Sequence, residues 1–101
     1  MTAVFGLWAS VLALSPTASA SPSSYLLALS QLAHPAVSND VLLFAGQQAC
    51  STLQGVRSSD YAKQAVYYSI LNRTGVIPSM AEAGTIVHVA VDHLCPEVGY
   101  P

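Results

Sequence analysis

The chain has 101 residues, of which 52% are hydrophobic and only 8% are charged, with a formal net charge of −2 at pH 7. This length fits one small domain, and the composition excludes a disordered polar tail, because such tails carry few apolar residues. The small negative charge gives no electrostatic attraction to phosphates, so we expect no nucleic-acid partner.

The N-terminal segment has the pattern of an export signal. Residues 3–14 form an uncharged apolar run, shorter than the roughly 20 residues that span a bilayer. Ala18 and Ala20 then make the A-x-A site that signal peptidase recognises. We therefore predict a signal peptide at 1–20, a mature domain at 21–101 without a transmembrane anchor, and a secreted or cell-envelope location. The alternative is that the apolar run forms a buried helix of the folded domain.

The first predicted helix of the mature chain is Tyr25–Ala33, in which apolar residues recur at helical spacing. Ser23 and Ser24 precede it. His34 ends it, because the residue before Pro35 is disfavoured in the helical region. The expected apolar stripe consists of Leu26, Leu29, Leu32 and Ala33.

The second predicted helix is Val41–Gln54. The polar side chains of Ser38–Asp40 can cap its N-terminus, and Gly55 supplies a C-terminal stop. Its expected buried stripe consists of Leu42, Leu43, Gly46, Ala49, Cys50 and Leu53.

The third predicted helix is Tyr61–Arg73, which follows a second set of capping side chains at Ser58–Asp60. Gly75 lies where a left-handed C-terminal residue is favoured. The expected apolar face consists of Ala62, Val66, Tyr67 and Ile70.

The fourth predicted helix is Ala83–Cys95, and Pro96 stops it. Ser79 and Glu82 form a capping box, in which each side chain can bond the backbone N–H of the other. The expected buried side consists of Ala83, Ile86, Val87, Ala90, Val91 and Leu94. The four helices together predict an all-α fold, a small helical bundle.

Cys50 and Cys95 are the only two cysteines of the chain. In an exported protein they are expected to form one intramolecular disulfide, which a small core needs for stability. Both lie near the C-terminal ends of their helices, and helices that run up, down and up bring these ends to the same pole. The alternative, a redox or nucleophilic cysteine, has neither a C-x-x-C spacing nor an adjacent basic residue.

Two motifs carry a resemblance to a known family: Gly46-x-x-x-Cys50-x-x-Leu53, and Ala83-x-x-x-Val87-x-x-Ala90 leading into Leu94-Cys95-Pro96. Over Tyr25–Glu97 the chain resembles the domain of unknown function 732 family of small exported actinobacterial proteins, best populated in mycobacteria. The resemblance implies a secreted, disulfide-stapled helical domain without an assigned activity. It implies no catalytic residues.

The tyrosines are the strongest candidates for a binding surface. Tyr61 and Tyr68 lie seven residues apart on one face of the third predicted helix, with Tyr67 beside them. Their rings can contact a partner or an apolar ligand, whereas the alternative is that they cover the small core. His88 and Asp92, four residues apart, are conceivable as a metal or acid–base pair, but we expect a solvated His88 because no recognised ligand spacing includes it. We expect no metal site and no catalytic residue.

We therefore expect a non-enzymatic protein without a cofactor, which binds an unknown protein or envelope component through a face that includes Tyr61, Tyr67, Tyr68 and His88. The alternative is a secreted carrier of a small apolar ligand such as a lipid or haem. An enclosed cavity of roughly 300 to 1,000 Å³ would favour the carrier.

Overall fold

The computed structural model describes residues 21–55 and 58–99, and within these ranges it contains four helices and no strand. The helices are α2 (Pro22–Ser30), α3 (Asn39–Gly55), α4 (Ser59–Thr74) and α5 (Met80–His93). The predicted all-α fold is thereby confirmed. The predicted signal peptide at 1–20 lies outside the described residues.

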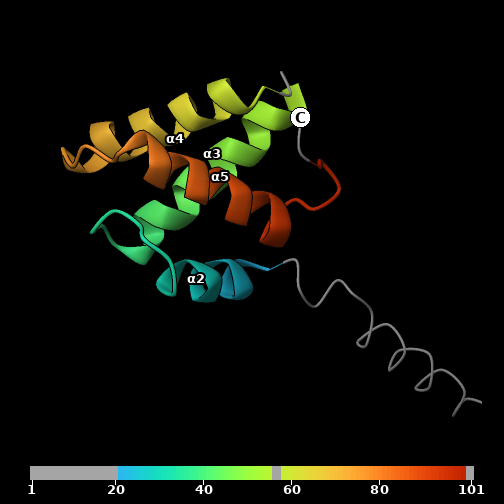
Figure 1. Ribbon diagram of the computed structural model, residues 1–101, viewed down its shortest axis with the longest axis horizontal. Coiled ribbons are helices and arrows are strands. Elements are labelled where there is room, and N and C mark those ends of the chain that lie inside the picture. The colour runs from blue at the N-terminus through green and yellow to red at the C-terminus, as the bar shows by residue number, and fades with distance from the viewer. Residues whose placement is uncertain (1–20, 56–57, 100–101) are drawn as a thin grey trace, which may run out of the picture.

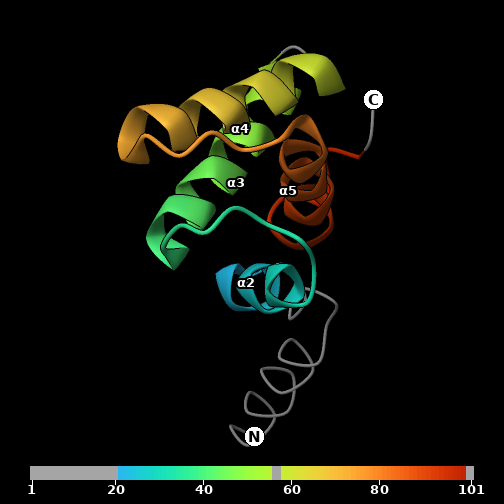
Figure 2. The same ribbon diagram turned by 60° about the vertical axis from the view of Figure 1, so that its left-hand side comes forward.

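The helices α3, α4 and α5 run in alternating directions (Figure 1). The helices α3 and α5 each pack against all the others, while α2 and α4 lie on opposite sides of the α3–α5 pair (Figure 2). The predicted up, down and up order of the last three helices is therefore present. None of the other described helices covers the outer side of α4.

The helix α2 differs from the prediction at both ends. Ser21 is its N-cap, with Oγ accepting from the Ser24 N–H at 3.2 Å, and Pro22 occupies the first turn. The predicted start was wrong because proline, whose missing N–H is not needed there, favours the beginning of a helix. The helix ends at Ser30 rather than Ala33, because its last turn tightens and later N–H groups bond three residues back.

The buried face of α2 also differs from the predicted leucine stripe. Tyr25 and Leu29 are buried, Leu26 is half-buried, and Leu32 lies beyond the helix and is 48% exposed. Tyr25 and Leu29 are four residues apart, so they lie on one side of the helix. The short helix thus packs through one turn that includes an aromatic ring.

Tyr25 is fully buried between α2 and α3, and its hydroxyl donates a hydrogen bond to the Leu42 carbonyl. The close approach requires Gly46, because a Cβ there would stand 2.6 Å from Tyr25 Cζ and 2.9 Å from Leu94 Cδ1. Burial raises the pKa of the Tyr25 hydroxyl, and a backbone hydrogen bond at Gly46 opposes this effect only in part. The contribution of the buried Tyr25 to the free energy of unfolding is therefore complete below the ordinary tyrosine pKa of about 10. It falls at higher pH, where the unfolded chain loses the Tyr25 proton more readily than the folded one.

The predicted buried stripe of α3 is largely confirmed. Leu42, Gly46, Ala49, Cys50 and Leu53 are buried. Two residues differ from the prediction, since Leu43 is only half-buried and Ala45 is fully buried. The buried arc is wider than one stripe because α3 packs against three helices.

The ends of α4 agree with its predicted signals. Ser58 is the N-cap, and its Oγ accepts from the Tyr61 N–H at 3.4 Å. Gly75 has φ of 77° and donates its N–H to the Leu71 carbonyl at 2.8 Å. The buried residues are Ala62, Val66 and Ile70, while Tyr67 is half-buried.

The capping box that opens α5 is confirmed. The Glu82 N–H donates to Ser79 Oγ at 3.0 Å, and the Ser79 N–H donates to Glu82 Oε1 at 2.9 Å. The helix begins at Met80 and ends at His93. The predicted buried side is present except that Leu94 is half-buried, and Val89 is buried in addition.

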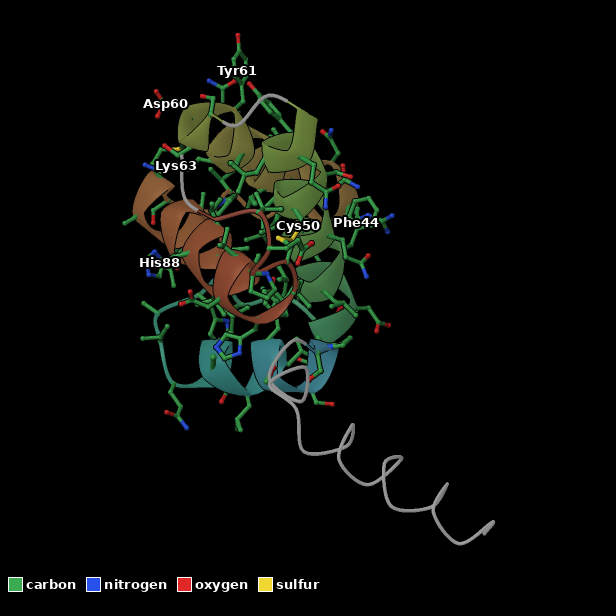
Figure 3. All side chains as sticks on the ribbon, turned by 90° about the vertical axis from the view of Figure 1, so that its right-hand side faces the viewer. Phe44, Cys50, Asp60, Tyr61, Lys63 and His88 are labelled. Atoms are coloured by element: carbon green, nitrogen blue, oxygen red, sulfur yellow. A yellow bond between two sulfur atoms is a disulfide. The ribbon has the colours of Figure 1, made fainter. Side chains whose placement is uncertain are left out.

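Cys50 and Cys95 form a disulfide with Cα atoms 6.0 Å apart, so the predicted pairing is confirmed. Both residues are buried, and Figure 3 labels Cys50 on the inner side of α3. The bond joins α3 to the segment that follows α5, and so holds together the two helices on which α2 and α4 pack.

Candidate functional site

The outer side of α4 carries exposed aromatic residues. Tyr61 and Tyr68 are 58% and 54% exposed. The half-buried Tyr67 ring meets the Tyr68 ring edge to face, with centroids 5.1 Å apart and planes at 80°. This contact orients both rings, because edge-to-face packing is a preferred aromatic geometry. Tyr67 and Tyr68 therefore form a contacting aromatic pair at the surface.

A surface hollow of about 430 Å³ adjoins the Tyr67–Tyr68 pair. Its other lining residues are Gln64 of α4 and Met80, the first residue of α5. We call it the methionine hollow. The Met80 side chain is 50% exposed, and an exposed thioether is an adaptable apolar contact.

A second hollow, of about 360 Å³, lies between α3 and α4 on the other side of Tyr68. We call it the arginine hollow. Its lining residues are Phe44, Gln48, Ala65, Tyr68, Ser69, Asn72 and Arg73. The guanidinium carbon of Arg73 lies 3.7 Å from the centroid of the Phe44 ring, which is a cation–π contact. Tyr68 thus lines both hollows and separates them.

A third hollow, of about 330 Å³, lies at the disulfide, with Cys50 and Cys95 in its wall together with Pro22 and Glu97. All three hollows are open to solvent. They are therefore depressions in the surface and not the enclosed cavity that would favour a carrier.

His88 is placed apart from the tyrosine pair. Its side chain is 66% exposed on α5, and its Nε2 lies 3.9 Å from Oδ2 of Asp92, which is 50% exposed. Such an exposed pair contributes little to stability. Figure 3 shows His88 on α5, Phe44 on the opposite side of the molecule, and Tyr61 pointing outward near the start of α4.

The predicted surface residues therefore divide into separate places. The structure brings Tyr67 and Tyr68 together at the methionine hollow, which neither Tyr61 nor His88 lines. Among the described residues there is no group of three or more His, Cys, Asp or Glu side chains that could hold a metal ion. No helix in the described ranges is long and apolar enough to cross a membrane.

Sequence reasoning missed the contact between Phe44 and Arg73. Part of this contact could have been predicted, because antiparallel α3 and α4 place the first turns of α3, with Phe44, beside the last turns of α4, with Arg73. The register that pairs these two residues depends on the connection between the helices and cannot be read from either helix alone.

These features define a small, disulfide-stapled, all-α domain with an aromatic surface on one helix. The chain belongs to the family described as "Protein of unknown function (DUF732)", which it matches over residues 18–97. The family resemblance seen in the sequence is thereby confirmed. No curated protein and no solved structure matches the chain.

Proposed function

We propose that this protein is an exported, non-enzymatic binding protein that docks another protein or an envelope component on the outer face of α4. The observation that carries the proposal is the position of Tyr68, a half-exposed ring that separates two open hollows. Tyrosine and methionine side chains are enriched at protein interfaces, where their rings and thioethers fill a partner's depressions. The face therefore has the chemistry of a docking surface.

The anchoring of α4 at both ends and along its inner face supports this proposal. The helix is capped at Ser58, ends at Gly75 and is held to the core by Ala62, Val66 and Ile70. A partner would therefore meet side chains that are already positioned, and binding would lose little conformational entropy.

The distribution of reactive groups supports binding rather than catalysis. Catalysis ordinarily needs a nucleophile or an acid–base set within mutual reach beside a pocket. His88 and Asp92 form such a local pair, but neither residue lines the methionine hollow or the arginine hollow.

A carrier of a small apolar ligand is the second candidate. The volume of the methionine hollow, about 430 Å³, favours it, since ligand sites measure roughly 300 to 1,000 Å³. The openness of the hollow favours docking of a larger partner, because a lipid or haem bound there would stay largely in water. Docking is therefore the function that we prefer.

Export is part of the proposal, and it predicts that the mature protein begins at Ser21. Cleavage after Ala20 would leave Ser21 in place as the N-cap of α2, so processing and folding are compatible. The disulfide is also typical of proteins that fold in oxidising compartments. N-terminal sequencing of secreted protein is the measurement. Retention of the apolar run at residues 3–14, or confinement of the protein to the cytosol, would contradict the prediction.

The double substitution of Tyr61→Ser and Tyr68→Ser is expected to weaken partner capture while changing the free energy of unfolding by no more than about 0.5 kcal/mol. Both rings are more than half exposed, so little buried area is lost. Urea unfolding and affinity capture from the producing organism's envelope and medium are the measurements. Leu27→Ser is the matched control, because Leu27 is 64% exposed on α2, away from α4. Unfolding of the double variant, or capture equal to that of the unmodified protein, would refute the docking face.

A further inference from the structure

The Phe44–Arg73 contact places a positive charge in the wall of the arginine hollow. Arg73 belongs to the last turn of α4, and its guanidinium lies over the Phe44 ring of α3 at 3.7 Å from the centroid. This contact places the guanidinium against the face of one aromatic ring. A guanidinium has five N–H donors, and a single ring contact leaves most of them available to an acceptor.

The hollow contains no negative charge to match Arg73. None of its lining residues is acidic, and within the described part of the chain no carboxylate lies within ion-pair distance of Arg73. The amides of Gln48 and Asn72 add further N–H donors, while Ser69 already donates its hydroxyl to the Ala65 carbonyl at 2.6 Å. The protein has a net charge of −2, so this hollow is a local exception. Its charge is complementary to an anion.

We propose that the arginine hollow binds a carboxylate whose attached apolar group lies against Tyr68. A carboxylate fits the guanidinium because both groups are planar and form two parallel hydrogen bonds. Tyr68 supplies an apolar wall beside these donors, and the volume of about 360 Å³ accommodates a small acid or a side chain. The proposal deepens the proposed docking function, on which its biological role rests, by naming the group that the partner presents.

A carboxylate fits better than a phosphate because of where the hollow lies. Arg73 is in the last turn of α4, where the helix dipole places partial negative charge. The C-terminal end of α4 therefore repels a doubly charged phosphate more strongly than a singly charged carboxylate. Arg73 is also the only basic residue that lines the hollow, whereas tightly bound phosphates usually meet several donors with positive charge.

The test is a titration of the oxidised full chain with benzoate and, separately, with benzamide, followed by the shifts of backbone amides in NMR spectra. Benzamide has nearly the same shape without the charge. Benzoate is expected to bind saturably with a Kd of roughly 1–10 mM and to shift amides around Phe44, Gln48 and Arg73. Benzamide is expected to bind at least about tenfold more weakly, because hydrogen bonds to charged groups are the stronger ones.

Two variants assign the preference to one guanidinium. Arg73→Gln is expected to abolish the preference for benzoate, and Arg73→Lys to retain part of it, because lysine keeps the charge but loses the planar fork. Lys63→Gln is the matched control, since it makes the same change in net charge at a residue that does not line the hollow. Equal binding of both probes, no shifts at the hollow, or an equal loss in Lys63→Gln would overturn the proposal.

The source of the carboxylate is distinguished by blocked dipeptides. A Phe-Glu dipeptide with both ends blocked represents a protein side chain, and Phe-Gln is its uncharged control. Stronger binding of Phe-Glu than of benzoate indicates a peptide ligand, and the reverse order indicates a free small acid. Tyr61→Ser separates the two proposals, because Tyr61 lies outside the hollow. If Tyr61→Ser leaves both partner capture and benzoate binding unchanged, the result contradicts the docking face on α4 and leaves the carboxylate site intact.

Discussion

Replacement of both Cys50 and Cys95 by Ala is expected to lower the free energy of unfolding by about 2–5 kcal/mol, the usual loss for a small secreted domain. The disulfide joins residues 45 positions apart, so its removal frees a long loop in the unfolded chain. A loss of this size is comparable to the whole stability of many small domains. Urea unfolding of the double variant beside the unmodified protein is the measurement.

Reduction of the unmodified protein provides the control for this substitution. Both cysteines are buried, so part of the effect of Ala could come from lost packing rather than from the lost bond. Reduction breaks the bond and keeps both sulfur atoms, and we expect most of the loss to remain. A change below about 0.5 kcal/mol in both experiments would contradict the importance of the staple, since that is the range of neutral surface substitutions.

Replacement of Tyr25 by Ala is expected to lower the free energy of unfolding by about 3–5 kcal/mol, as for other buried aromatic residues. The ring is fully buried, and its loss leaves a cavity between α2 and α3 as well as removing the hydrogen bond to Leu42. Gly46→Ala is expected to cost about 1–3 kcal/mol in the unmodified protein, because its Cβ would stand 2.6 Å from Tyr25 Cζ.

The two substitutions together isolate the contact. Once Tyr25 is Ala, the clash with its ring disappears, and only the contact with Leu94 Cδ1 at 2.9 Å remains, which a flexible leucine side chain can relieve. Gly46→Ala should then cost less than in the unmodified protein, or become neutral because alanine favours a helix more than glycine does. Gly55→Ala is the control, because a Cβ at Gly55 meets nothing within 4 Å. A Gly46→Ala effect that is the same with and without the Tyr25 ring would show that the two residues do not make the contact described.

The features that could be predicted from the sequence are local or have few alternatives. The capping box at Ser79 and Glu82 needs residues only three apart, and Gly75 ends α4 through its own backbone conformation. The disulfide could be predicted because Cys50 and Cys95 have no other partner in the chain.

The features that could not be predicted depend on tertiary contacts. The buried side of α2 is set by Gly46 of α3, which leaves room for the Tyr25 ring. As a result, Leu29 is the only fully buried leucine of the predicted stripe. The sequence predicted that Tyr68 lies on a helix but left open whether its ring is buried or exposed. A tyrosine has an apolar ring and a polar hydroxyl, so it suits both places. The arginine hollow, which both Tyr68 and Arg73 line, depends on the register between α3 and α4.

The most direct test of the docking face is photo-cross-linking in the producing organism, with a benzophenone amino acid in place of Tyr68. The same amino acid in place of Leu27 is the control, since that residue lies on α2 and is at least as exposed, at 64% against 54% for Tyr68. We predict one dominant cross-linked partner from position 68, identified by mass spectrometry, and its absence from position 27. Equal adducts from both positions, or none from position 68 while the protein is folded and oxidised, would contradict the proposal that α4 carries the binding surface.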